Sequence, residues 1–374
     1  MIKHFDSCTV IINPRRYPKS VSKLEKILEK TDVSKVVISK SKENFIESVS
    51  EFYASENKNL LVWGGDGTAH DAINAVMNSS NNDSRKTRPK KSIGFLRGGS
   101  GNGIQDSYEV PHDIINPLEK QLRCYEDSIK NEYNIDVDLI KVDNGISQIY
   151  CQLAGFGFDV EVLRSREERR YRKGALAGEA VAGMKNYVLS TINAFFKRYD
   201  EMDNKFSFVL SEGKNVVIGH RTKAEHRFDD VSRVTSAPLI EIGTRPYYGR
   251  MFKICPDVVC NDGYMDVYLF NFEDKWDAAR NIFWLYTGKH DKINKKFWKQ
   301  NKPPIERYEV ESVEVISDQP FYYHVDGELK FHSTKELDEY PIKFTIIPES
   351  INFLVPKQFY KSFNWFNEDD GFEE

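Results

Sequence analysis

The stretch NLLVWGGDGTAHDAINAVM, residues 59–77, limits the fold of this chain more than any other feature. Its first residues are apolar and predict a buried strand. Its last residues place Ile73, Val76 and Met77 at spacings of three and four, which is typical of an amphipathic helix. The glycine-rich turn GGDGT lies between the two. A strand that enters a helix through such a turn is a unit of the parallel α/β sheets that bind phosphates.

The first 131 residues repeat this alternation of strand and helix. Alternation of this kind indicates a parallel sheet with helices on its faces. Ligands of such sheets bind outside the carboxyl ends of the strands, so the loops after each strand are the places to look for chemistry. We expect strands at residues 8–13, 35–39, 60–63 and 92–96, and helices at 21–30, 44–54 and from about residue 69.

From residue 132 onward the sequence changes to short strand patterns, among them the segment 148–163, with one helical pattern at about 176–198. This texture is typical of antiparallel β-structure. We therefore predict two domains of α/β and β class. Residues 1–131 form a Rossmann-like parallel α/β domain, which residues 350–374 complete, and residues 132–349 form a β-sandwich-like domain.

The composition excludes several classes of protein. The chain has 374 residues, enough for two domains, and 40% of them are hydrophobic. A net charge of −4 gives no basic field for nucleic acid. Five cysteines without a Cys-x-x-Cys pair, and an N-terminus unlike a signal peptide, predict a reducing, cytoplasmic location. No apolar run approaches the ~18 residues that span a bilayer, so membrane contact is expected to be peripheral.

The glycines of the first loop suit it to an anion. Backbone N–H groups can converge on a phosphate where no Cβ blocks the approach, and the following helix adds its positive dipole end. Gly64, Gly65 and Gly67 are therefore expected to hold a polyphosphate. Thr68 is expected to cap the helix and to offer its hydroxyl to a phosphate oxygen. Asp71 either completes a capping box with Thr68 or has a direct role, and the sequence leaves both open.

Asp66 is the residue of this loop that is hardest to explain by structure alone. A carboxylate beside a phosphate cradle is electrostatically costly. It makes chemical sense if it holds a magnesium ion or takes a proton from an attacking hydroxyl. The plain alternative is that Asp66 and Gly67 form an ordinary Asp-Gly turn.

Two later loops also place polar residues and glycines directly after a strand. Residues 97–104, RGGSGNGI, set Ser100 and Asn102 among several glycines. Near the C-terminus a strand runs into Asp326-Gly327-Glu328, which taken alone fits a simple hairpin turn. Neither glycine loop has the Walker A pattern, and the His-Arg-Asp and Asp-Phe-Gly motifs of protein kinases are missing.

Taken in order, five motifs resemble those of the diacylglycerol kinase-like lipid kinases, which include bacterial soluble diacylglycerol kinases, sphingosine kinases and ceramide kinases. The motifs are GGDGTAHDAINAV, GGSGNG, AGFGFDVEV, CPDVVCNDGYMDVYLF and HVDGE, and INPRR at residues 12–16 resembles the family's first motif. The resemblance covers nearly the whole chain. It implies an α/β domain that binds ATP, a β-rich domain on the lipid side, and an active site in the cleft between them.

The resemblance also implies roles for single residues. Asp66 matches the acid implicated in catalysis, while Asp326 and Glu328 match an acidic pair from the second domain, one of them being the expected base. Ser39 matches a family hydroxyl less closely. The residues assigned to ATP by the loops and the resemblance are Asn13, Ser39, Gly64, Gly65, Asp66, Gly67, Thr68, Gly99, Ser100 and Asn102.

On the lipid side, Asp159 matches an acid near the lipid head in sphingosine kinases. Asp262, with the main-chain oxygens of Val259 and Tyr264, resembles a structural magnesium site of bacterial members. The alternative for this segment is another Asp-Gly turn. The implied cofactors are therefore ATP and Mg²⁺.

The chain departs from the family pattern at several positions. Gly103 stands where the second loop usually carries an acid, although Asp106 lies close in sequence. Arg97 stands where many members have proline. Arg15 and Arg16 replace small residues of the first motif, and either guanidinium could neutralise phosphate charge.

Together these features predict an ATP-dependent lipid kinase that phosphorylates a lipid hydroxyl, with diacylglycerol to phosphatidic acid as the first choice of reaction. The open alternatives are a sphingoid-base or other lipid kinase, a soluble NAD kinase-like enzyme, and a catalytically silent lipid- or nucleotide-binding module.

Residues 164–174 are strongly basic, and residues 281–302 mix aromatics with lysines, as suits an anionic membrane surface. A solvated charged face and a packed aromatic helix are the respective alternatives. No nucleic acid partner is expected, and a homodimer stays open.

Overall fold

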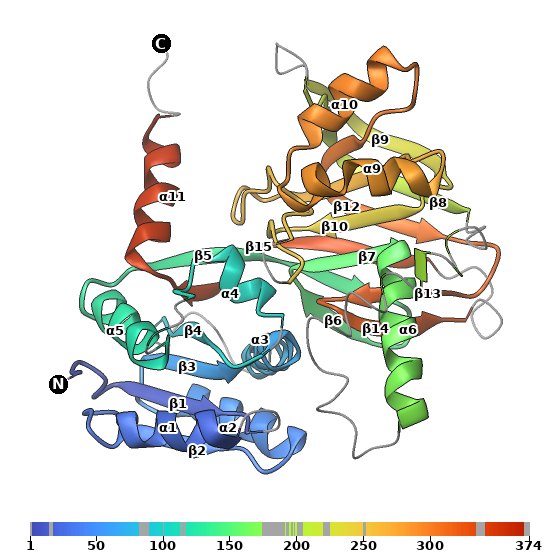
Figure 1. The fold of residues 1–374 in the computed structure, drawn as a ribbon. Helices are drawn as coiled ribbons and strands as arrows, with labels where there is room; N and C mark the ends of the chain where they lie inside the picture. Colours follow the sequence, from blue (N-terminus) through green and yellow to red (C-terminus); the bar gives the residue numbers. More distant parts are fainter. Residues whose placement is uncertain are drawn as a thin grey trace. The chain divides into compact units, whose positions relative to one another are not determined.

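The structure is a computed structural model of the chain in two compact units, Met1–Val137 with Glu349–Glu374, and Asp138–Pro348 (Figure 1). The chain passes from one unit to the other through the strands β5 (Asn134–Asp143) and β15 (Ile342–Leu354). The residues described are 2–14, 18–81, 90–99, 101–112, 115, 117–173, 205–219, 225–249, 252–333 and 341–369, with a few single positions between 191 and 199.

The first unit contains the predicted parallel sheet. Its neighbouring strands run in the order β4-β3-β1-β2, all parallel, and β15 joins β4. The register places Ile12 beside Trp63, so β1 and β3 end level with each other. The loops that follow therefore lie side by side at the carboxyl ends of the strands, where ligands of such sheets bind. The strand bounds are β1 Cys8–Ile12, β2 Lys35–Ile38, β3 Asn59–Gly64 and β4 Ser92–Arg97.

Helices cover both faces of this sheet. One core cluster joins α1 and α5 to the strands through residues such as Leu24, Leu122, Val10 and Leu61. On the other side α2 and α3 contact each other and the strands β1 and β3. Three helices that the sequence did not predict, α4, α5 and α11, also belong to this unit. The helix bounds are α1 Pro18–Leu28, α2 Lys42–Ala54, α3 Asp66–Asn81, α4 Gly103–Ser107, α5 Pro117–Lys130 and α11 Lys357–Asp369.

The second unit is β-rich, as predicted. Its strands pair antiparallel in the order β14-β13-β7-β10-β11-β12, while β8 joins β12 and β9 joins β8 as a long hairpin. Aromatic side chains fill the core, with Phe156 in contact with Phe206, Phe321 and Tyr323. The bounds are β6 Gln148–Cys151, β7 Leu153–Gly157, β8 Phe206–Val216, β9 Glu225–Thr235, β10 Leu239–Gly243, β11 Met265–Phe270, β12 Glu306–Ile316, β13 Phe321–Val325 and β14 Glu328–His332.

The expected strand at 148–163 is wrong in its second half. β7 ends at Gly157, where the backbone turns with a φ of +93° and the helix α6 (Phe158–Lys173) begins. The segment was misread because its apolar residues alternate as in a strand. Val160 and Leu163, three residues apart, are both buried on the helix. Most of the helical pattern expected at 176–198 lies outside the described residues.

Two helices of the second unit, α9 (Lys275–Tyr286) and α10 (His290–Lys299), pack against each other (Figure 1). The Asp274 carboxylate begins α9 as an N-cap by accepting the Asp277 N–H at 2.9 Å. Among the described residues, no helix has the length and apolar character needed to cross a membrane.

Candidate active site

The first glycine loop is tied to the residue that follows β1. The Asn13 N–H donates to the Trp63 carbonyl at 3.1 Å, and its Nδ2 donates to the Thr68 hydroxyl, also at 3.1 Å. Because Thr68 Oγ1 accepts this bond, its own hydrogen can turn toward a phosphate oxygen. Asn13 and Thr68, both predicted to bind ATP, therefore lie together at the carboxyl edge of the sheet.

The predicted cap at Thr68 is wrong, because α3 begins at Asp66 and the Gly65 carbonyl accepts the N–H groups of both Thr68 and Ala69 at 3.0 Å. The capping-box alternative for Asp71 fails with it. The Asp71 carboxylate instead pairs with Lys42 of α2 at 2.7 Å. The N-terminal end of α3, with its positive dipole end, thus lies directly at the glycine loop, as a phosphate site requires.

The two glycine loops pack backbone against backbone. A Cβ on Gly99 would lie 2.3 Å from the Gly65 Cα, and a Cβ on Gly98 would lie 2.8 Å from the Gly64 nitrogen. The Gly98 N–H also donates to the Gly64 carbonyl at 2.8 Å. Glycine is therefore needed at 99 for close approach of the loops, in addition to any need to admit a phosphate.

We expect Gly99→Ala to destabilise the protein by about 1–3 kcal/mol, the range of an overpacking change, and to weaken ATP binding because the Gly65 loop must move. Urea unfolding and titration calorimetry with ATP would measure both. Glu56→Ala, at an exposed position outside the loops, serves as the control. Unchanged stability and ATP affinity in Gly99→Ala would contradict this account of the loop packing.

Asp66 is held by the second loop. Its Oδ1 accepts the Gly103 N–H at 2.5 Å, and a Cβ on Gly101 would lie 2.1 Å from its Oδ2. Asn102, with a left-handed φ of 62°, shapes this loop by bonding both the N–H and the carbonyl of Gly99 through its side chain at 3.0 Å. The position where the family usually carries an acid therefore contributes a backbone N–H that orients Asp66.

Arg97 and Asp106, two of the unusual features of the second loop, form an ion pair at 2.6 Å. Both side chains are less than a tenth exposed, and Arg97 also donates to the Val110 carbonyl at 2.9 and 2.7 Å. A proline at 97 would make none of these bonds. The pair therefore stabilises the segment between Arg97 and Val110, which carries Gly103.

The structure describes only some of the remaining residues that were predicted to bind ATP. Ser39 is buried after β2, and its hydroxyl donates to the Ile12 carbonyl at 3.2 Å. Ser100, Arg15 and Arg16 lie outside the described residues.

In the second unit, Asp326 lies in the two-residue turn between β13 and β14, where it and Gly327 have φ values of +49° and +81°. Its Oδ1 accepts the N–H groups of Gln152 and Leu153 at 3.2 and 3.1 Å and pairs with Arg245 at 3.3 Å. The two charged side chains are 0% and 2% exposed. The structure therefore has an Asp-Gly turn at this position, and the Asp326 carboxylate is part of a buried ion pair.

Glu328 differs from Asp326 in environment although it is only two residues away. It begins β14, its side chain is 34% exposed, and its carboxylate lies 3.4 Å from Lys330. Of the two acids in the Asp-Gly-Glu motif, Glu328 is the one whose carboxylate is open to a substrate.

Asp159 belongs to a buried cluster that the sequence did not reveal. It lies at the start of α6, and its carboxylate is 2.5 Å from His324 Nε2 of β13, which in turn lies 3.5 Å from the Glu241 carboxylate of β10. Glu241 is the one charged residue of the apolar strand LIEIG, a signal that would have singled it out. His324 precedes Asp326 in the motif HVDGE but matched no known role.

The pKa values of Glu241 and His324 are both raised within this cluster. Burial and the nearby Asp159 carboxylate raise the pKa of Glu241 to about 8. Burial alone would lower the pKa of His324, but Asp159 and Glu241 outweigh it and raise that pKa to about 10. Two carboxylates in an apolar interior thus compete for one positive charge.

The segment predicted to hold a structural magnesium forms a tight acidic loop. Asp262 Oδ1 accepts the Tyr264 N–H at 3.1 Å, and the Gly263 N–H donates to Asp138 Oδ2 at 2.8 Å. Burial, with Glu309 and Asp138 nearby, raises the pKa of Asp262 to about 6. Acidic groups gathered this closely are the kind of group that a hard cation neutralises.

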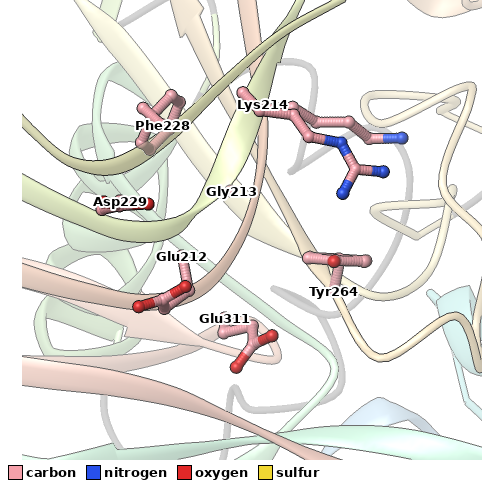
Figure 2. Close-up of a pocket in the computed structure, with 8 residues that line it drawn as sticks. Glu212, Gly213, Lys214, Phe228, Asp229, Tyr264 and Glu311 are labelled. Carbon is pink, nitrogen blue, oxygen red and sulfur yellow. The ribbon is translucent and has the colours of Figure 1, made fainter.

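A pocket of about 220 Å³ borders this loop and is shown in Figure 2. It carries both signs of charge, and Tyr264 is the one residue predicted for a site that lines it. We assign it no catalytic role. Its lining residues are Glu212, Gly213, Lys214, Arg227, Phe228, Asp229, Tyr264 and Glu311.

Comparison with known proteins finds two domain families along the chain. Residues 7–131 match the diacylglycerol kinase catalytic domain, and residues 179–355 match the YegS C-terminal NAD kinase beta sandwich-like domain. A protein of Staphylococcus aureus strain JH9 named "Putative lipid kinase" is 22% identical over 303 residues, which cover 81% of this chain and 79% of that protein.

Solved structures resemble the whole fold. The crystal structure of a "putative diacylglycerol kinase" from Bacillus anthracis str. Sterne has a TM-score of 0.60 at 16% identity and covers 95% of this chain and 97% of its own. A second diacylglycerol kinase structure from the same organism has a TM-score of 0.56 at 13% identity, with coverage of 95% and 98%. The chain therefore contains a diacylglycerol kinase catalytic domain followed by a YegS-type C-terminal domain, and over 81% of its length it resembles a protein named a putative lipid kinase.

Proposed function

We propose that this protein is an ATP-dependent lipid kinase that transfers the γ-phosphoryl group of ATP to a lipid hydroxyl, with diacylglycerol as the expected acceptor. The observation that carries the proposal is the placement of Asp66. Its carboxylate is fixed by the Gly103 N–H beside a glycine cradle that opens onto the first turn of α3. A cradle of this kind suits a polyphosphate, and an acid beside it suits phosphoryl transfer to a hydroxyl.

ATP would be held by the first unit. The N–H groups of Gly65 and Gly67 would bind its phosphates at the positive dipole end of α3, and the Thr68 hydroxyl, oriented by Asn13, would donate to one phosphate oxygen. Bound Mg²⁺ would neutralise charge on the transferred phosphoryl group, and Asp66 is the residue proposed to hold it. A second, structural Mg²⁺ is proposed at Asp262 with the carbonyls of Val259 and Tyr264.

The three candidate acids divide by environment. Asp326 is buried and paired with Arg245, so we propose that it positions the turn that carries Glu328. Asp66 and Glu328 remain as groups that can orient or deprotonate the acceptor hydroxyl. Proton transfer by a placed carboxylate contributes about 10²–10⁴-fold to a rate.

Glu328→Gln is expected to lower kcat by about 10²-fold while the Kd for ATP stays unchanged, since the proposed ATP residues belong to the first unit. Steady-state kinetics with varied lipid, together with ATP binding by calorimetry, would measure the two effects separately. Lys330→Gln is the matched control, because it removes the ion-pair partner of Glu328 and leaves the Glu328 carboxylate in place. A rise in lipid KM alone would mean that Glu328 positions the lipid and that Asp66 is the candidate base.

Contact with a membrane surface is the second part of the proposal, and α9 supports it. Ile282 and Phe283 are 57% and 66% exposed, Trp276 and Tyr286 are about half exposed, and Lys289 lies over the Phe283 ring at 5.9 Å. Exposed aromatics beside lysine suit the interface of an anionic membrane. The alternative of a packed aromatic helix holds instead for Phe297 of α10, which is buried.

The acceptor is tested by incubating the protein with labelled ATP and Mg²⁺ and one acceptor at a time: diacylglycerol, sphingosine, ceramide, phosphatidylglycerol, undecaprenol or NAD. We expect transfer to diacylglycerol. Transfer to another lipid would support the lipid kinase proposal but would replace diacylglycerol as the acceptor. Transfer to NAD with none to any lipid would overturn the proposal in favour of a dinucleotide kinase.

A further inference from the structure

We propose that Asp159, Glu241 and His324 form a binding site for one divalent transition-metal ion, with Zn²⁺ as the ion of choice. The inference goes beyond the proposed kinase activity and does not depend on it. The site is built within the second unit alone.

The three residues come from separate elements that converge at one point. Asp159 lies in the first turn of α6, Glu241 in the middle of β10, and His324 near the end of β13. The pairing of β7 with both β10 and β13 brings Glu241 and His324 together across Gly155. One ligand atom from each residue lies within 4.8 Å of the other two, so small side-chain shifts would bring all three onto a single ion.

Glycine at 155 keeps the space beside these ligands open. A Cβ at this position would lie 2.6 Å from His324 Nε2 and 2.9 Å from Glu241 Cδ. Any larger residue would displace both ligands. The glycine of the family-like motif AGFGFD is therefore required here by the cluster.

The ligand atoms are buried and ion-paired but lack aligned hydrogen bonds. Both Asp159 oxygens, Glu241 Oε2 and His324 Nε2 are shielded from solvent and make no hydrogen bond within the described part of the chain. His324 Nε2 and Asp159 Oδ2 are 2.5 Å apart, which is the distance of an ion pair, although the two groups do not meet in hydrogen-bond geometry. Ligand atoms about 2.0–2.1 Å from a tetrahedral ion lie roughly 3.3 Å apart, so a metal would separate these two atoms slightly. Buried polar groups without well-aligned hydrogen bonds are costly, and a bound cation would relieve that cost.

The chemistry of the ligands favours a transition metal over magnesium. An imidazole nitrogen with two carboxylates is a mixed N/O set, whereas Mg²⁺ prefers oxygen alone. Two carboxylates and a neutral imidazole carry a net charge of −2, which a divalent ion cancels. Three protein ligands also leave a fourth tetrahedral position for water.

Two contacts oppose metal binding and define what metal loading must change: the ion pair of His324 Nε2 with Asp159, whose proton the metal must displace, and a hydrogen bond at Nδ1. The Gly327 N–H points at His324 Nδ1 from 3.4 Å, which favours a hydrogen on Nε2, whereas a metal at Nε2 requires the hydrogen on Nδ1. A bond this long is weak, so its loss when the metal binds costs little. On its other side the ring packs against Tyr248 with the ring centroids 5.0 Å apart.

The test is metal content and thermal stability of the full chain after removal of all metal with a chelator. The protein is loaded with Zn²⁺ alone or Mg²⁺ alone, dialysed, and analysed by inductively coupled plasma mass spectrometry. We expect one Zn²⁺ per chain, retention of no Mg²⁺ at this site, and a rise in Tm with Zn²⁺. Glu241→Gln and His324→Gln should each weaken Zn²⁺ affinity by ~10-fold or more.

Asp262→Asn is the matched control, because it changes the other proposed cation loop of the same unit, and it should keep its Zn²⁺. Circular dichroism checks the fold of each variant. If His324→Gln fails to fold, the near-isosteric Glu241→Gln carries the test. Absence of tight Zn²⁺ from the wild type, or equal Zn²⁺ affinity in wild type and Glu241→Gln, would overturn the proposal and leave the cluster as a buried ion pair.

Discussion

Asp66→Asn is expected to reduce kcat by at least ~100-fold while the protein stays folded and still binds ATP. The amide oxygen of asparagine can accept the Gly103 N–H that now bonds Asp66 Oδ1, so the loop keeps its shape. The substitution removes only the negative charge, and with it the ability to hold Mg²⁺ or accept a proton. Steady-state turnover with ATP and the accepted lipid, with calorimetry for ATP, would measure both effects.

Asp71→Asn is the matched control for this experiment. Asp71 lies on the same helix, and its carboxylate pairs with Lys42, away from the glycine cradle contacts. We expect near-normal turnover from it. Near-normal turnover of a folded Asp66→Asn enzyme would remove Asp66 from the mechanism.

Asp326→Ala is expected to destabilise the protein by about 3–5 kcal/mol, the cost of leaving one partner of a buried ion pair without the other. The change strands the Arg245 guanidinium, which is 2% exposed, and removes the acceptor for two backbone N–H groups. Urea unfolding followed by circular dichroism measures the loss.

The double variant Asp326→Ala with Arg245→Met separates this effect from catalysis. Removing both charges should cost less than the sum of the single changes, because neither charge is then stranded. If Asp326→Ala instead keeps wild-type stability and loses only turnover, the positioning role is wrong and Asp326 is a direct participant in the reaction.

Local patterns in the sequence were enough to predict the parallel strands and the first three helices of the first unit. β1, β3 and β4 are almost fully buried and the glycine turn directly follows β3, so apolar runs and turn residues predicted these elements within a few positions. The helices α4, α5 and α11 were not predicted. The predicted start of α3, at about residue 69, is three residues later than the observed start at Asp66. Glycine has a low helix propensity, so Gly67 was assigned to the loop, although the first turn of a helix tolerates it.

Partners brought together by tertiary structure could not be predicted. Arg245 and Asp326 are 81 residues apart, and Glu241 and His324 meet only because β7 pairs with both of their strands. A sequence pattern carries no signal for such pairing when each residue looks ordinary in its own strand. The helix α6 was missed for a related reason, since its alternating apolar residues fit both a strand and a helix until Gly157 turns the chain.

The central claim is tested most directly by following the labelled γ-phosphate of ATP into the organic phase after incubation with diacylglycerol vesicles and Mg²⁺. The proposal predicts labelled phosphatidic acid from the wild type, formed in step with ADP, and at least ~100-fold less from Asp66→Asn. Label that stays in the aqueous phase with every lipid acceptor, from a wild-type protein that binds ATP, would contradict the lipid kinase and favour a silent binding module.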